Sequence, residues 1–135
     1  MTEFKELMDQ INKEGNPKKI WKARREAIRP MVQLKTEEAI NEVIKLLRED
    51  NNSSVRVRAA IVLGEEKVKT SKDALLEALE RDWDSGVRFY SLRSLGLLGL
   101  PRQEVLKIME QAEKSDNRKR VRNLASKIKN EILAN

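Results

Sequence analysis

One short phrase occurs three times in this chain: an aspartate, four variable residues, a valine and an arginine. The copies run from Asp50 to Arg56, from Asp82 to Arg88 and from Asp116 to Arg122, at spacings of 32 and 34 residues. A period of a few tens of residues inside helical patterns is typical of solenoids made of stacked helix pairs. The repeat therefore predicts an all-α solenoid in which each helix pair contacts its neighbours.

Length and composition agree with an all-α class. The chain has 135 residues, which is the size of one domain, and contains only 5 Gly and 3 Pro. Leu, Ala, Glu, Lys and Arg, which favour helices, are abundant. We therefore expect a single domain, residues 1–135, with about seven or eight helices.

Helix start and stop signals divide the chain into successive elements. Pro30 is expected to stop or kink one helix, Gly64 and Gly99 to end two others, and the final helix to lack a partner. The expected elements are a capping helix at about 3–14, repeats at about 17–50, 53–82 and 85–114, and a C-terminal capping helix at about 117–133.

Two segments carry a more specific resemblance. Residues 50–64 and 82–96 each begin with Asp, contain Val-Arg and close with Leu-Gly. They resemble HEAT-like repeats, of the short type found in phycobilisome lyases and many small prokaryotic proteins. That resemblance implies a right-handed α-solenoid of stacked antiparallel helix pairs.

The resemblance also implies that the repeated Asp and Arg side chains tie adjacent repeats together. An Asp before a helix is favoured by the helix dipole, and an Arg offers a planar fork of donors that suits a neighbouring carboxylate. The residues of this expected structural ladder are Asp50, Arg56, Asp82, Arg88, Asp116 and Arg122.

Catalysis is disfavoured by the residue types that the sequence lacks. It contains no His and no Cys, so the commonest general base, the thiolate nucleophile and the usual zinc ligands are missing. There is also no glycine-rich phosphate loop. We expect no enzymatic activity, cofactor or metal, and, because the chain starts without an apolar signal segment, a cytoplasmic location.

A binding or scaffolding function remains, with another protein or peptide as the partner and the chain itself a monomer. The family resemblance implies that the second helix of each pair lines a concave groove, where mixed charges suit a polypeptide. The candidate surface residues are Asn41, Lys45, Arg48, Lys72, Glu77, Arg81, Gln103, Lys107 and Gln111.

The charge distribution supports an alternative partner, the backbone of a nucleic acid. The formal net charge of +6 divides into +4 for residues 1–35, −3 for 36–82 and +5 for 83–135. Aromatic residues are few, which weakens this reading, and Trp83 is expected to cover the edge of the core. The candidate basic patch consists of Lys18, Lys19, Lys22, Arg25, Arg118, Lys119 and Arg120.

Overall fold

The computed structural model describes residues 2–135, and these residues form eight α-helices with one short 3-10 turn. This confirms the predicted all-α class and the expected number of helices. The helices are α1 (Thr2–Ile11), α2 (Pro17–Gln33), α3 (Glu37–Glu49), α4 (Ser53–Glu65), α5 (Lys72–Arg81), α6 (Ser85–Leu97), α7 (Arg102–Ser115) and α8 (Lys119–Ala134), and the turn is η1 (Lys69–Ser71).

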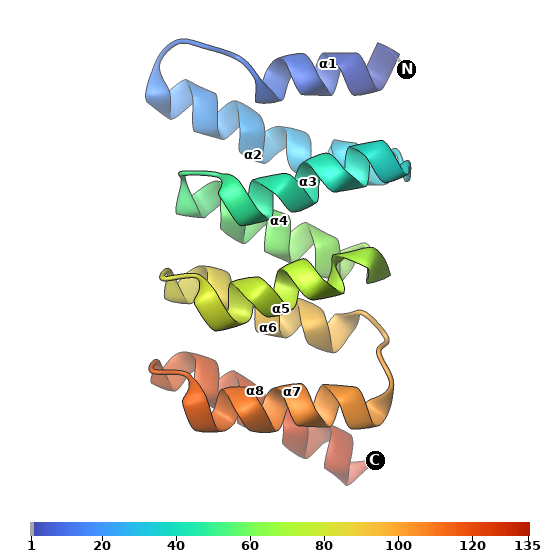
Figure 1. Cartoon of the computed structure of the whole chain (residues 1–135), viewed down its shortest axis with the longest axis vertical. Coiled ribbons are helices and arrows are strands. Elements are labelled where there is room, and N and C mark those ends of the chain that lie inside the picture. Colours follow the sequence, from blue (N-terminus) through green and yellow to red (C-terminus); the bar gives the residue numbers. More distant parts are fainter. Residues whose placement is uncertain (1) are drawn as a thin grey trace.

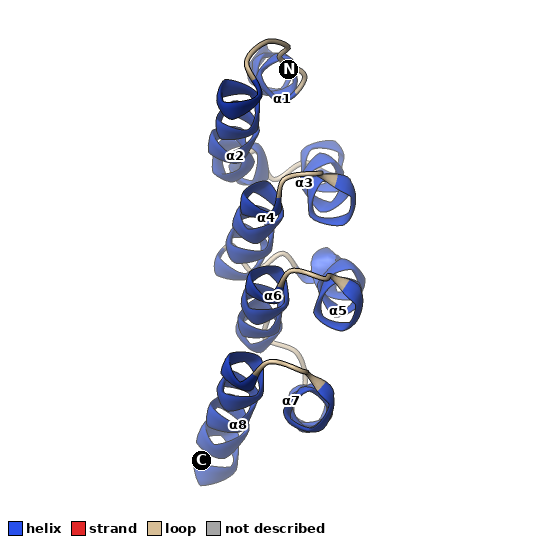
Figure 2. Cartoon of the chain, turned by 90° about the vertical axis from the view of Figure 1, so that its left-hand side faces the viewer, coloured by secondary structure: helices blue, strands red, loops and turns tan. Residues whose placement is uncertain are grey.

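The helices stack along one long axis in two columns (Figures 1 and 2). Helices α2, α4, α6 and α8 form the first column and pack on one another in that order. Helices α3, α5 and α7 form the second column, and each packs on the first-column helix that follows it in the chain. The architecture is a solenoid, as predicted, with α1 packed on α2 at one end.

Within residues 2–135 no second-column helix follows the final helix, α8. Helix α8 packs against both α6 and α7, and its Val121 and Ala125 are fully buried. A stripe of small and branched residues is wide enough to contact two helices at once.

Close packing of the first column depends on a glycine. A Cβ atom on Gly64 of α4 would lie 2.1 Å from Ser94 Oγ and 2.6 Å from Ser94 Cα of α6. Gly64 does not end its helix as expected, since α4 continues to Glu65 and Lys67 adopts the left-handed conformation beyond it, with φ 52°. Gly99, with φ 77°, does follow the end of α6.

Helix α2 continues through Pro30 to Gln33, so the first of the two expected effects of Pro30, a stop, is wrong. A proline inside a helix removes the hydrogen bond to the carbonyl four residues earlier. That carbonyl belongs to Glu26, and both Glu26 and Pro30 are exposed. Water can therefore bind the freed carbonyl, and the helix tolerates the proline.

Helices α4 and α6, in the middle of the stack, carry fully buried apolar side chains. Val55, Val62 and Leu63 of α4 and Leu92 and Leu95 of α6 have no exposed surface. Both helices are therefore interior layers, as the apolar residues around most of their circumference predict. In α1, by contrast, Ile11 is the single buried side chain among those described, and it keeps 8% exposure.

Candidate functional site

Ion pairs between successive repeats run along the edge of the stack where α4, α6 and α8 begin. Arg56 of α4 donates from Nε to Asp82 Oδ2 at 2.9 Å and from Nη2 to Asp82 Oδ1 at 3.2 Å. Its Nη1 atom donates to the backbone carbonyl of Asp50 at 2.8 Å. One guanidinium thus joins the turn before its own helix to the turn before the next first-column helix.

Arg88 of α6 repeats this arrangement. It donates to Asp116 at 3.0 and 3.4 Å and to the Asp82 carbonyl at 2.9 Å. The Nη2 atom also donates to the side chain of Asn117 at 2.9 Å. The turns that precede α4, α6 and α8 are therefore held by the same pair of contacts at each step.

A further arginine that the sequence reading missed begins this series. Arg24 of α2 donates to the two carboxylate oxygens of Asp50 at 2.7 and 3.1 Å. It lies 32 residues before Arg56, the same interval that separates Arg56 from Arg88. The repeat period was the available signal, but the Asp position of the phrase is occupied there by Lys18.

Arg122 differs from the other arginines of the series. It donates to the backbone carbonyl of Asp116 at 2.8 Å, as its counterparts do within their own repeats. Among residues 2–135, however, no carboxylate lies within ion-pair distance of its guanidinium. Arg122 therefore holds only its own turn.

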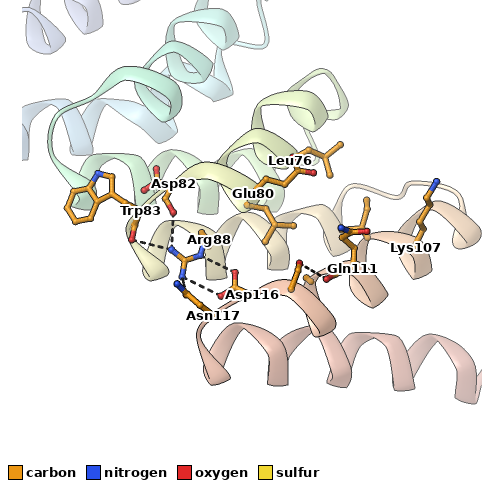
Figure 3. A pocket seen from close by; sticks show the side chains of 13 residues that line it. Leu76, Glu80, Asp82, Trp83, Arg88, Lys107, Gln111, Asp116 and Asn117 are labelled. Atoms are coloured by element: carbon orange, nitrogen blue, oxygen red, sulfur yellow. Dashed lines mark hydrogen bonds and ion pairs between the residues drawn. The ribbon is translucent and has the colours of Figure 1, made fainter.

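The largest groove described lies between α5 and α7, next to these ion pairs, and has a volume of about 650 Å³ (Figure 3). Its base is apolar, because Leu79 and Ala112 are buried there and Leu76 and Ile108 are half-buried. Helix α5 packs mainly on α6 and α7 on α8, which leaves the space between them open. The polar lining residues are Glu80, Asp82, Arg88, Lys107, Gln111, Ser115, Asp116 and Asn117.

Trp83 stands at one end of this groove with 80% of its surface exposed. The expectation that it covers the core edge is wrong. Its backbone carbonyl accepts a hydrogen bond from Arg88 at 3.2 Å, and the Arg56 guanidinium lies 5.6 Å from the centroid of its ring. The ion pairs therefore fix the turn, while the indole points outward (Figure 3).

A second, smaller groove of about 430 Å³ lies between α3 and α5 and also includes Trp83. An ion pair crosses it, since Arg48 Nε donates to Glu77 Oε2 at 2.9 Å. Arg48 lies two residues before Asp50, and Glu77 lies five residues before Asp82. The equivalent residues of the larger groove are Glu80, two before Asp82, and Gln111, five before Asp116. In residues 2–135 no side-chain hydrogen bond joins those two, so the larger groove is uncovered.

The candidate surface residues are divided among several positions. Arg48, Glu77 and Arg81 line the smaller groove, and Lys107 and Gln111 line the larger one. Lys72 pairs with Glu104 where α5 and α7 begin, and the hydrogen bond and charge of Glu104 raise the pKa of the Lys72 ammonium. Lys72 lines neither groove, and the same is true of Asn41, Lys45 and Gln103, which are exposed.

The basic residues form two clusters rather than one patch. Lys18, Lys19 and Lys22 lie in the first turns of α2, and Arg118, Lys119 and Arg120 lie at the start of α8. Three helix-to-helix steps separate α2 from α8, or roughly 24–30 Å at the usual interaxial distance. The two clusters are therefore independent.

Arginines in both basic clusters are already engaged with aromatic rings. Arg25 lies 5.2 Å from the centroid of the Trp21 ring and donates to Ser54 at 3.3 Å. Arg120 lies 4.0 Å from the Phe89 centroid. Arg25 and Arg120 are therefore each held against an aromatic ring.

Within residues 2–135 no three His, Cys, Asp or Glu side chains are grouped so that they could hold a metal ion. None of the helices in that range is both long enough and apolar enough to cross a membrane.

Stacked helix pairs with the same inter-repeat ion pairs define an all-helical repeat protein. The family model for HEAT repeats matches residues 7–96 and again residues 40–128. The chain therefore belongs to the HEAT-repeat family, as its repeated Asp and Val-Arg phrases suggested. Comparisons with curated proteins and with solved structures gave no match.

Proposed function

We propose that this chain is a non-catalytic module that binds a segment of a partner protein in the groove between α5 and α7. The observation that carries the proposal is an open groove with an apolar base beside a tryptophan that is 80% exposed. Tryptophan is among the residues that contribute most to protein interfaces. HEAT repeats generally mediate protein binding or scaffolding, which agrees with this proposal.

Leu133 is another large apolar residue with an exposed side chain, but its surroundings differ from those of Trp83. It is 56% exposed and lies near the end of α8, away from the lining of the larger groove. A lone exposed leucine is common on protein surfaces and needs no ligand to explain it. Trp83 is different because it adjoins a recess that can hold side chains of a partner.

Nucleic-acid binding is the second candidate, and the two basic clusters favour it. They lie at the starts of α2 and α8, on the same edge of the stack in Figure 1. Binding through them would be directed at the phosphate backbone and would weaken steeply as the salt concentration rises. The ladder aspartates at the starts of α4 and α6 lie between the clusters, which disfavours one continuous nucleic-acid track.

Selection from a random peptide display library tests the first candidate. Enriched peptides should bind Trp83→Ala and Leu76→Lys at least about tenfold more weakly than the unchanged protein, because both changes alter the groove. Leu133→Ala is the matched control and should bind equally well. If no peptide is enriched, or if the groove variants bind as well as the control, the proposal is wrong.

Labelled duplex and single-stranded DNA and RNA of unrelated sequences test the second candidate. We expect no binding at near-physiological salt. Salt-sensitive binding that disappears when Lys18, Lys19, Lys22, Arg118, Lys119 and Arg120 become Gln would instead support a nucleic-acid function.

A further inference from the structure

Two opposite charges line the larger groove. Glu80 comes from α5 and Lys107 from α7, and both are exposed. Within residues 2–135 neither side chain takes part in an ion pair or a side-chain hydrogen bond. Their neighbours Arg48, Glu77, Lys72 and Glu104 are all paired between helices. The free charges are therefore available to a ligand.

These two charges lie at different depths along the groove. Helices α5 and α7 run in the same direction, and each ends directly before a ladder aspartate, Asp82 or Asp116 (Figure 1). Glu80 precedes its aspartate by two residues and Lys107 by nine. At 1.5 Å of rise per helical residue, this difference corresponds to about 10 Å along the groove.

The apolar base lies between the two charges. Leu76 and Ile108 precede their ladder aspartates by six and eight residues, which places them between Glu80 and Lys107 along the axis. Trp83 lies beyond Glu80 at one end, and Lys107 stands at the other end in the close view (Figure 3). The groove therefore presents, in order, an aromatic ring, a negative charge, an apolar base and a positive charge.

We propose that the groove binds its peptide in one direction, with a basic side chain at the Trp83 end and an acidic side chain at the Lys107 end. This inference rests on the proposed peptide-binding function. The basic group would pair with Glu80 and can stack on the exposed indole, while an apolar side chain enters between Leu76 and Ile108. In an extended segment, a separation of about 10 Å spans roughly three residues.

Reversal of one charge at a time tests the direction. A display library of random peptides is selected separately on the unchanged protein, on Glu80→Lys and on Lys107→Glu. Peptides from the unchanged protein should carry Lys or Arg on one side of an apolar residue and Asp or Glu on the other. Selection on Glu80→Lys should remove the basic preference alone, and selection on Lys107→Glu the acidic preference alone.

Synthetic peptides then give the affinities. The best peptide should bind Glu80→Lys about two- to fivefold more weakly, which is the range for an exposed ion pair. Replacing its basic residue by Glu should restore binding to Glu80→Lys and weaken binding to the unchanged protein. Glu110→Lys, a charge reversal on α7 at an exposed residue outside the lining, is the matched control and should have no effect.

The outcomes separate this inference from the function on which it rests. Enriched peptides that need Trp83 and Leu76, but whose charges do not respond to either reversal, would overturn the direction and leave peptide binding intact. A library that yields no enriched peptide on any variant would overturn both.

Discussion

Arg56 and Asp82 are bound to each other by two hydrogen bonds, of 2.9 and 3.2 Å, although 26 residues separate them in the chain. Their side chains are 7% and 10% exposed. The Arg56 guanidinium also donates to the backbone carbonyl of Asp50, so hydrogen bonds to two different turns hold it in place. Breaking such a pair is costly, because removing either side chain leaves the other charge buried without a partner.

We therefore expect Asp82→Ala to lower the free energy of unfolding by about 3 kcal/mol. The variant strands the Arg56 charge and also loses the hydrogen bond that Asp82 accepts from the Asp84 amide. Arg48→Ala breaks an exposed pair and should cost less than about 1 kcal/mol. Urea unfolding of both variants makes the comparison, and equal losses would show that the buried pair contributes no more than the exposed one.

Two glycines should respond to alanine in opposite directions. Gly64→Ala would place a Cβ atom 2.6 Å from Ser94 Cα, so α4 and α6 must separate, at a cost of about 1–3 kcal/mol. Gly96→Ala meets nothing closer than Ile128 Cδ1 at 3.5 Å. Because alanine favours a helix over glycine, Gly96→Ala should stabilise the protein by up to about 1 kcal/mol. Thermal or urea unfolding that ranks the two variants in reverse would contradict the packing described.

Trp83→Ala should separate stability from binding. The indole buries little surface, and its contact with Arg56 is worth about 0.5–1 kcal/mol, so stability should fall by no more than about 1 kcal/mol. Loss of an interface tryptophan should weaken the binding of a selected peptide at least about tenfold, or about 1.4 kcal/mol. Urea unfolding and fluorescence anisotropy measure the two quantities. A large loss of stability with unchanged affinity would assign Trp83 to the core after all.

The contribution of the Glu113–Lys129 pair should depend on pH. Hydrogen bonds donated by Lys129 and Ser126 lower the pKa of Glu113 below its ordinary value. A carboxylate with a lowered pKa stabilises the folded state above its ordinary pKa, and this contribution is lost as the pH falls through the lowered value.

The stability difference between the unchanged protein and Lys129→Met should therefore be present at neutral pH and shrink in acid. Urea unfolding over a pH series measures it, and NMR titration should show the pKa of Glu113 returning toward its ordinary value in the variant. Lys127→Met removes a neighbouring exposed charge and serves as the control. A difference that stays constant with pH would mean that Lys129 acts through packing alone.

The sequence predicted the solenoid because the same residues recur at each turn between repeats. Arg56 and Arg88 could be assigned to inter-repeat contacts for that reason. Arg24 makes the same contact but escaped notice, since its repeat has Lys18 where the others have Asp. A period measured on the arginines alone would have found it.

The groove could not be predicted, because it depends on which neighbouring side chains meet. An ion pair crosses the space between α3 and α5 because Arg48 faces Glu77 there. None crosses the space between α5 and α7, where Glu80 and Gln111 take the equivalent positions. Trp83 was misplaced for a similar reason. The sequence places Trp83 in a turn. The direction of its indole depends on how the turn is held, and Arg88 holds it through a hydrogen bond to the Trp83 carbonyl.

The two ends of the larger groove are held with unequal strength. At one end the Arg88 and Asp116 side chains are 9% and 5% exposed, while at the other the Lys72 and Glu104 side chains are 35% and 34% exposed. Salt and water weaken the exposed pair far more than the buried one. Bending of the stack would therefore separate α5 and α7 first at Lys72 and Glu104, with Arg88 as the hinge. A partner segment could enter from the Lys107 end while the spacing beside Trp83 stays constant.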